Sequence, residues 1–112
     1  PGQTKTDLGS LNIDSWKSTS LGCECQFLGT YKIDFDVNVE LVSPTSENIK
    51  VEKRWTVNNN VIDRSYANHT AIGLTTGDVV RMEIRLVGGS ADNAIIADTG
   101  HTSSLTITRL GD

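Results

Sequence analysis

The chain has 112 residues and a net charge of −4, from ten basic and fourteen acidic residues. That length predicts one domain that buries enough surface to fold without disulfides or metals. Its Lys and Arg residues are not grouped, which argues against a nucleic-acid groove or a patch for an anionic membrane surface. No apolar run approaches the roughly 20 residues of a membrane span, and the N-terminus lacks a secretory pattern.

Residues 1–9 are polar, and we expect them to form an arm in front of a single domain over residues 10–112. Pro1 has three interpretations. The first, which we favour, is a complete chain whose initiator Met has been removed. The others are the scar of a cleaved tag and the last residues of a collagen-like stalk.

The longest hydrophobic alternation runs over residues 29–41. Its apolar side chains recur at every second position, while charged and polar ones occupy the positions between. Because successive side chains of a strand point to opposite faces, this pattern predicts one long, half-buried central strand. The residues expected on its buried face are Tyr31, Ile33, Phe35, Val37, Val39 and Leu41.

Shorter strands and turns are predicted around this central strand. Residues 11–15 predict a first strand, residues 17–22 a loop, and residues 23–28 a second strand. Residues 43–48 predict a turn. Residues 49–57 alternate and should pair with the central strand as an antiparallel hairpin, residues 58–60 predict a tight turn, and residues 61–66 begin a return strand.

The second half of the chain continues the same pattern. Gly77 and Asp78 predict a turn before a strand over residues 79–87. We then expect a loop at residues 88–93, a short strand at 94–97, a turn at 98–100 and a last strand at 103–110. Helical periodicity is absent over any useful length, so the fold class predicted is all-β: an antiparallel β-sandwich, jelly-roll-like, of about eight strands.

The residues that carry chemistry favour no enzyme and no cofactor. Cys23 and Cys25 are too close to form a relaxed disulfide, and they are expected to be reduced thiols. His69 and His101 lie far from them, so no zinc-ligand spacing is present. Asp34 and Asp36 share a strand face beside Lys32 and look like solvated carboxylates; no nucleophile motif surrounds a Ser.

Two tryptophans deserve separate interpretations. Trp55 is in phase with the apolar residues of its strand and is expected in the core, although Lys53 shares that face. Trp16 is out of phase with its neighbours. It is either an exposed anchor for a sugar or a protein, or a cover over the edge of the sandwich.

Three segments resemble the jelly-roll family of tumour necrosis factor and the complement globular heads. Residues 29–37 resemble the family's Gly-x-Tyr-x-Ile/Phe strand, and residues 77–80 resemble its Gly-Asp-x-Val entry to the next long strand. Residues 103–110 resemble the closing strand in the form found in bacteriophage fibre, head-fibre and decoration proteins. The resemblance spans residues 29–110.

The resemblance implies a virion protein made in the host cytoplasm. We expect a capsid decoration or cement protein that binds the outside of the shell and stabilises it, with the major capsid protein or another virion protein as partner. Such domains typically form homotrimers, and the seam residues implied are Tyr31, Phe35, Met82 and Ile84. The arm would be the clamp on the capsid, through Gln3, Thr4, Lys5, Thr6, Asp7 and Leu8.

The alternative is a trimeric receptor-binding fibre or head-fibre domain that recognises a host-surface glycan. Asn, His and Asp side chains hydrogen-bond well to sugars, although they also make turns. The contact residues expected for a glycan or another partner are Trp16, Asn59, Asn60, Asn68, His69, Asp92 and Asn93.

Overall fold

The structure is a computed structural model that describes residues 6–96 and 103–112. These residues form nine strands and no helix. All strand pairs within the sheets are antiparallel. The prediction of an all-β antiparallel sandwich is confirmed, with nine strands rather than about eight. Jelly-roll connectivity stays a prediction.

The strands fall into three three-stranded sheets, with the orders β1-β8-β4, β2-β7-β5 and β6-β3-β9. Their bounds are β1 Thr6–Leu11, β2 Lys17–Glu24, β3 Gly29–Asp36, β4 Val39–Pro44, β5 Lys50–Val57, β6 Thr70–Leu74, β7 Val79–Val87, β8 Ala91–Ile96 and β9 Ser104–Gly111.

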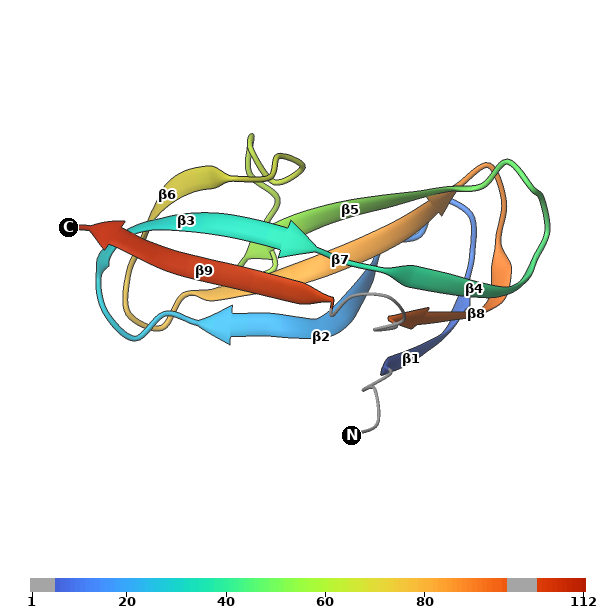
Figure 1. The fold of residues 1–112 in the computed structure, drawn as a ribbon, viewed down its shortest axis with the longest axis horizontal. Helices are drawn as coiled ribbons and strands as arrows, with labels where there is room; N and C mark the ends of the chain where they lie inside the picture. The colour runs from blue at the N-terminus through green and yellow to red at the C-terminus, as the bar shows by residue number, and fades with distance from the viewer. Residues whose placement is uncertain (1–5, 97–102) are drawn as a thin grey trace.

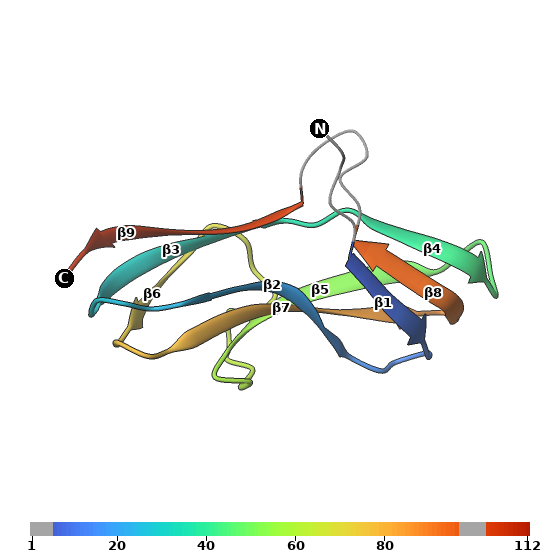
Figure 2. The same ribbon diagram turned by 90° about the horizontal axis from the view of Figure 1, so that it is seen from below.

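The sheet β6-β3-β9 faces the sheet β2-β7-β5 across the core (Figure 2). β3 leads into β4 after two residues, so one long run of chain links β6-β3-β9 to β1-β8-β4 (Figure 1). The molecule is thin, with extents of 46 × 36 × 20 Å. A thickness of 20 Å fits two packed layers.

The predicted central strand is therefore two strands. The break falls at Val37 and Asn38, where the Asn38 N–H donates to Ser103 Oγ at 2.8 Å. Ile33 and Val37 are buried, as the alternation predicted, while Tyr31 and Phe35 are only half-buried.

The predicted hairpin between the central strand and residues 49–57 is wrong. β5 pairs with β7, in a register that sets Trp55 opposite Met82, whereas β4 pairs with β8. The turn at residues 45–49 carries the chain from one sheet to another, so it forms an arch between layers rather than a hairpin.

The strand predicted at residues 79–87 is confirmed as β7, the central strand of its sheet. Met82 and Ile84 are 0% exposed, as are Val80 and Leu86 on the same face. Met82 and Ile84 therefore pack in the protomer's own core and are not available as residues of a trimer seam.

The N-terminal strands lie elsewhere than predicted. β1 begins at Thr6 and takes in residues 6–9 of the expected arm, while Ile13 is 52% exposed. Register shifts on either side of Gly9, which has φ +76°, let Leu8 and Leu11 both point inward although they are three residues apart. A bulge of this kind breaks the two-residue period on which the prediction relied.

Around β2, a predicted loop is a strand and part of a predicted strand is a turn. The predicted loop at residues 17–22 is part of β2, and residues 25–28 of the predicted second strand form a turn. β2 also carries a register shift between Ser18 and Gly22. Its buried Thr19 donates to the Met82 carbonyl at 3.0 Å, which satisfies a hydroxyl inside the sandwich.

The return strand predicted at residues 61–66 is a turn-rich loop instead. Trp55 holds this loop against β5, because its N–H donates to the Ser65 carbonyl and its Nε1 donates to the Ala67 carbonyl, both at 2.9 Å. The tight turn before it is confirmed: Asn58 and Asn59 have φ of +52° and +65°. β8 begins at Ala91, inside the predicted loop at 88–93, and the predicted turn at 98–100 lies outside the described residues.

Gly29 is buried where β3 meets the end of β9. A Cβ placed on Gly29 would lie 2.6 Å from Arg109 Nε and 2.7 Å from the Gly111 carbonyl oxygen. Real Cβ atoms do not come that close to backbone, so β9 must move away for any other residue to fit.

We predict that Gly29→Ala lowers the free energy of unfolding by about 1–3 kcal/mol, the usual cost of overpacking. Gly73→Ala is the matched control, because a Cβ at Gly73 in β6 meets nothing within 4 Å. Its expected effect is neutral or a gain of up to about 1 kcal/mol. Urea unfolding of both variants measures the difference, and equal stabilities would contradict the close approach at Gly29.

Candidate binding surface

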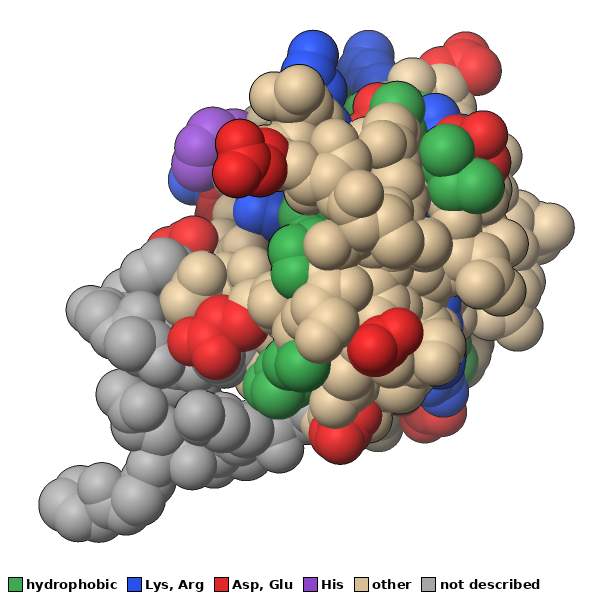
Figure 3. Space-filling view, turned by 90° about the vertical axis from the view of Figure 1, so that its right-hand side faces the viewer, with side chains coloured by type: hydrophobic (Ala, Val, Ile, Leu, Met, Phe, Trp, Pro, Cys, Tyr) green, Lys and Arg blue, Asp and Glu red, His purple; other side chains and the backbone are tan. Residues whose placement is uncertain are grey.

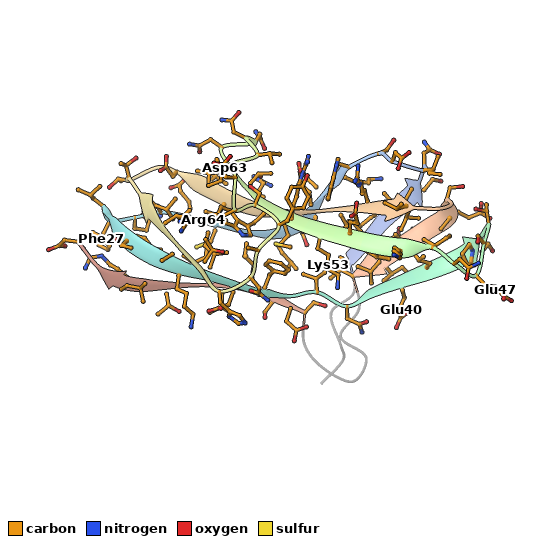
Figure 4. The ribbon with its side chains drawn as sticks, turned by 90° about the horizontal axis from the view of Figure 1, so that it is seen from above. Phe27, Glu40, Glu47, Lys53, Asp63 and Arg64 are labelled. Carbon is orange, nitrogen blue, oxygen red and sulfur yellow. The ribbon has the colours of Figure 1, made fainter. Side chains whose placement is uncertain are left out.

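Three large hydrophobic side chains are exposed at one end of the sandwich. Phe27 is 72% exposed, Leu28 66% and Leu110 56%. Phe27 and Leu28 lie in the turn between β2 and β3, and Leu110 lies at the end of β9, which reaches the same end of the molecule (Figure 1). Figure 4 shows Phe27 at the tip of this end. We call these three residues the apolar end.

The opposite end has a different surface. Figure 3 views it directly and shows mainly backbone and uncharged polar surface, with separate acidic, basic and hydrophobic side chains. The acidic residues labelled in Figure 4 include Glu40 and Glu47 at this end. The three most exposed large hydrophobic residues of the described chain are those of the apolar end.

A second turn, residues 75–78, holds the turn that carries Phe27 and Leu28. The Cys25 N–H donates to the Asp78 carbonyl at 2.7 Å, and the Gly77 N–H donates to the Cys25 carbonyl at 2.8 Å. Thr76 Oγ1 donates to the Gln26 carbonyl at 3.2 Å. The apolar end therefore rests on a pair of turns joined through their backbones.

The backbone carbonyls of Phe27 and Leu28 also have partners. Tyr31 Oη donates to the Phe27 carbonyl at 2.5 Å, and an Arg109 Nη donates to the Leu28 carbonyl at 2.9 Å. Asp112 accepts from the same Arg109 nitrogen at 2.7 Å. These bonds fix the turn through its main chain and leave both apolar side chains outside.

A cavity of about 230 Å³ opens beside Phe27, between the two layers. Its walls come from both sheets: Leu74 and Val80 are buried at its floor, and Ile107 is half-buried on β9. The full lining consists of Cys23, Glu24, Cys25, Gln26, Phe27, Tyr31, Leu74, Val80 and Ile107.

The polar groups of this lining are largely engaged. Cys25 Sγ donates to the Phe27 carbonyl at 3.1 Å, beside the Tyr31 hydroxyl. Burial, and next the hydrogen bond with the Cys25 thiol, raises the pKa of Tyr31 above its usual value, so the phenol stays protonated at neutral pH. Glu24 is the one charged residue among those lining the cavity. The cavity is thus suited to bind an apolar group.

The residues predicted to contact a glycan are not brought together. Asn59 and Asn60 lie at the turn after β5, and Asp92 and Asn93 lie on β8 in a different sheet. Asn68 is occupied by β3, since its amide both accepts from the Phe35 N–H at 2.9 Å and donates to the Phe35 carbonyl at 2.8 Å. His69 beside it contacts the Asp34 carboxylate on the same sheet.

Trp16 packs on the outer face of the sheet β2-β7-β5. The guanidinium of Arg54 lies 3.9 Å from its ring centroid and that of Arg85 lies 4.9 Å away, while Tyr66 meets it edge-on with centroids 5.9 Å apart. Arg54 also pairs with Glu83 at 2.7 Å. Trp16 is therefore half-buried in a cation–π cluster on this outer face, and its role as a partner contact stays a prediction.

The expected arm contacts divide between described and undescribed residues. Gln3, Thr4 and Lys5 lie outside the described residues, and of Thr6 only the backbone is described, in β1. Asp7 is exposed and accepts from the Gly9 N–H at 2.8 Å. Leu8 is buried in the core and is not available for an outside contact.

Sequence reasoning missed the apolar end because residues 23–28 were predicted as a strand. A signal was present: Phe27 and Leu28 are adjacent, and on a strand they must point to opposite faces. Two neighbouring large hydrophobic residues just before a glycine thus fit an exposed turn as well as they fit a strand. Leu110 gave no separate signal, because it continued the apolar pattern of the last strand.

The described residues hold no group of three or more His, Cys, Asp or Glu side chains placed to bind a metal ion. They also include no helix long and apolar enough to cross a membrane. Comparisons of the chain with family models, with curated proteins and with solved structures find no match.

We predict that Asp78→Asn weakens the support of the apolar end in a pH-dependent way. The Thr75 backbone N–H, and next the Asn58 amide, donate to this carboxylate and lower its pKa below the ordinary value of 3.8. A lowered folded-state pKa stabilises the fold above the unfolded-state value, and this stabilisation is lost as pH falls through the folded-state value. Asp78→Asn should therefore lower Tm at pH 7, and the gap from wild type should narrow in acid.

Thermal unfolding between pH 7 and pH 2.5 tests this expectation. Asp63→Asn is the control, because Asp63 lies on the exposed loop after β5 (Figure 4). A gap for Asp78→Asn that stays constant down to pH 2.5 would show that the ionised carboxylate is not what stabilises the turn.

Proposed function

We propose that the protein is a structural protein of a bacteriophage virion, a decoration protein that docks on the outside of the capsid through its apolar end. The resemblance of residues 29–37, 77–80 and 103–110 to phage jelly-roll proteins supports the class of protein. The observation that carries the docking surface is the exposure of Phe27, Leu28 and Leu110 at one end of the sandwich, where Phe27 also lines an apolar cavity.

The proposed mechanism needs only the burial of apolar side chains and many equivalent binding sites on the shell. Covering a side chain such as Phe27 or Leu28 contributes about 1.5–3 kcal/mol. A shell offers many equivalent sites, and a ligand that binds only the assembled state stabilises that state by mass action. A modest contact per copy is therefore enough to stabilise the capsid.

The homotrimer remains part of the proposal, with two of the four expected seam residues. Tyr31 and Phe35 on β3 are half-buried and remain as seam residues. Met82 and Ile84 are excluded because they lie in the protomer's own core. The fibre-head alternative has less support, because its expected glycan contacts lie on separate elements and Asn68 is already bonded to Phe35.

We predict that the double variant Phe27→Ser, Leu28→Ser binds capsids at least tenfold more weakly than wild type. Both side chains are exposed, so the fold should keep its stability while the docking surface loses its apolar area. Cosedimentation with capsids of the encoding virus, stripped of accessory proteins, measures the affinity. Val42→Ser is the matched control, since Val42 is 44% exposed on β4 in a different sheet.

A separate deletion distinguishes the apolar end from the arm as the main clamp. We expect a chain that lacks residues 1–5 to keep most of its capsid affinity. Loss of binding in this deletion, together with unchanged binding of the double variant, would assign the clamp to the arm and remove the apolar end from the mechanism.

A further inference from the structure

The cavity beside Phe27 has the size of a site for one ring system. Its volume is about 230 Å³. A dry apolar cavity of about 150 Å³ in another protein holds a benzene molecule, so this cavity has room for a single ring or a fused pair. The walls come from five strands and the turn 25–28, so the space is part of the sandwich rather than a gap beside one mobile loop.

The chemistry of the lining selects the occupant further. Leu74, Val80 and Ile107 offer only hydrocarbon, and the Cys25 thiol and Tyr31 hydroxyl already donate to the Phe27 carbonyl. A polar occupant would gain few hydrogen bonds there and would lose its hydration. An uncharged ring loses little hydration when it enters the cavity.

Charge at the cavity does not select a charged occupant. Glu24 is the one charged residue of the lining, but Arg81 lines the adjoining groove with Glu24, and Arg109 interacts with Tyr31 of the lining. Groups of both signs therefore lie near the cavity. Its apolar walls favour an uncharged ring over a charged one.

We propose that this cavity binds an uncharged aromatic side chain of the protein on which the apolar end docks. The assignment to a partner's side chain rests on the proposed function. Phe27, which lines the cavity, is 72% exposed, and Leu28 and Leu110 are exposed at the same end of the sandwich. A buried aromatic anchor beside exposed apolar side chains is the usual anatomy of an interface hot spot.

The preference for an uncharged ring is tested first, with indole as the probe. Indole is titrated into the full chain, and methyl NMR shifts are followed at Leu74, Val80 and Ile107. Indole should shift these methyls and leave Val42 unmoved. Shifts scattered over the protein, or none up to the solubility limit of indole, would overturn the cavity as a site.

Two variants then test the lining. Ile107→Phe should fill the cavity and reduce indole binding at least tenfold. Because Ile107→Phe also alters core packing, Cys23→Phe is the second blocking variant: Cys23 is exposed at the rim, so an aromatic ring there competes for the cavity without repacking the core. Undiminished indole binding in both blocking variants would place the probe elsewhere.

Capsid cosedimentation of Cys23→Phe separates the two proposals. Loss of capsid binding, with the apolar end intact, supports a partner's aromatic anchor. Binding of indole to the wild-type cavity together with full capsid binding of Cys23→Phe would overturn the partner as source of the ring and leave the docking proposal standing. Indole binding by a wild-type chain that ignores capsids would overturn both the docking proposal and the partner's anchor, and would leave free aromatic molecules as the ligands.

Discussion

The buried face of β7 is the constraint on which the rest of the structure depends. β7 is the central strand of its sheet, and Val80, Met82, Ile84 and Leu86 are fully buried between the layers. Each such side chain contributes about 1.5–3 kcal/mol when it is removed from water. Trp55 on β5, opposite Met82, adds the largest side chain of this core. The other layer must therefore cover this face.

The outer face of the same sheet is organised by charge rather than by burial. Arg54 pairs with Glu83 and Arg85 with Glu52, and in both cases the partners are directly opposite in the register of β5 and β7. Trp16 lies on the two guanidiniums and so ties the connection between β1 and β2 to this face. One strand pair thus serves as core on one side and as an anchor for surface segments on the other.

Local patterns were enough to predict β5, β7 and the turns beside them, because their alternation is unbroken and Asn58 and Asn59 accept a positive φ. Prediction was wrong where a bulge changes the phase, as at Gly9, and where pairing is decided by distant contacts. The hairpin assigned to β5 failed for the second reason: nothing near residues 45–49 indicates that the chain crosses to the other layer. The break at Val37 and Asn38 is also invisible locally, since the apolar alternation continues through it.

The candidate site is harder to predict from sequence than the fold, because it is made by closure of the sandwich end. Cys25 and Asp78 are 53 positions apart, yet their backbone hydrogen bond at 2.7 Å fixes the turn that exposes Phe27. Leu74, Val80 and Ile107 enter the cavity from three different strands. No spacing rule links these residues. The residues expected to contact a glycan lie on separate elements, because polar turn residues are common wherever chains reverse.

The side chains of the apolar end are not what the fold requires at those positions. The carbonyls of Phe27 and Leu28 are bonded by Tyr31 and Arg109 whatever side chains they carry, so two polar residues would satisfy this turn equally well. Exposed large hydrophobic side chains lower solubility, and a grouped set of them at one end of a small domain is typical of an interaction surface. Neither core packing nor turn geometry requires Phe27 and Leu28, and the proposed docking surface is based on them for this reason.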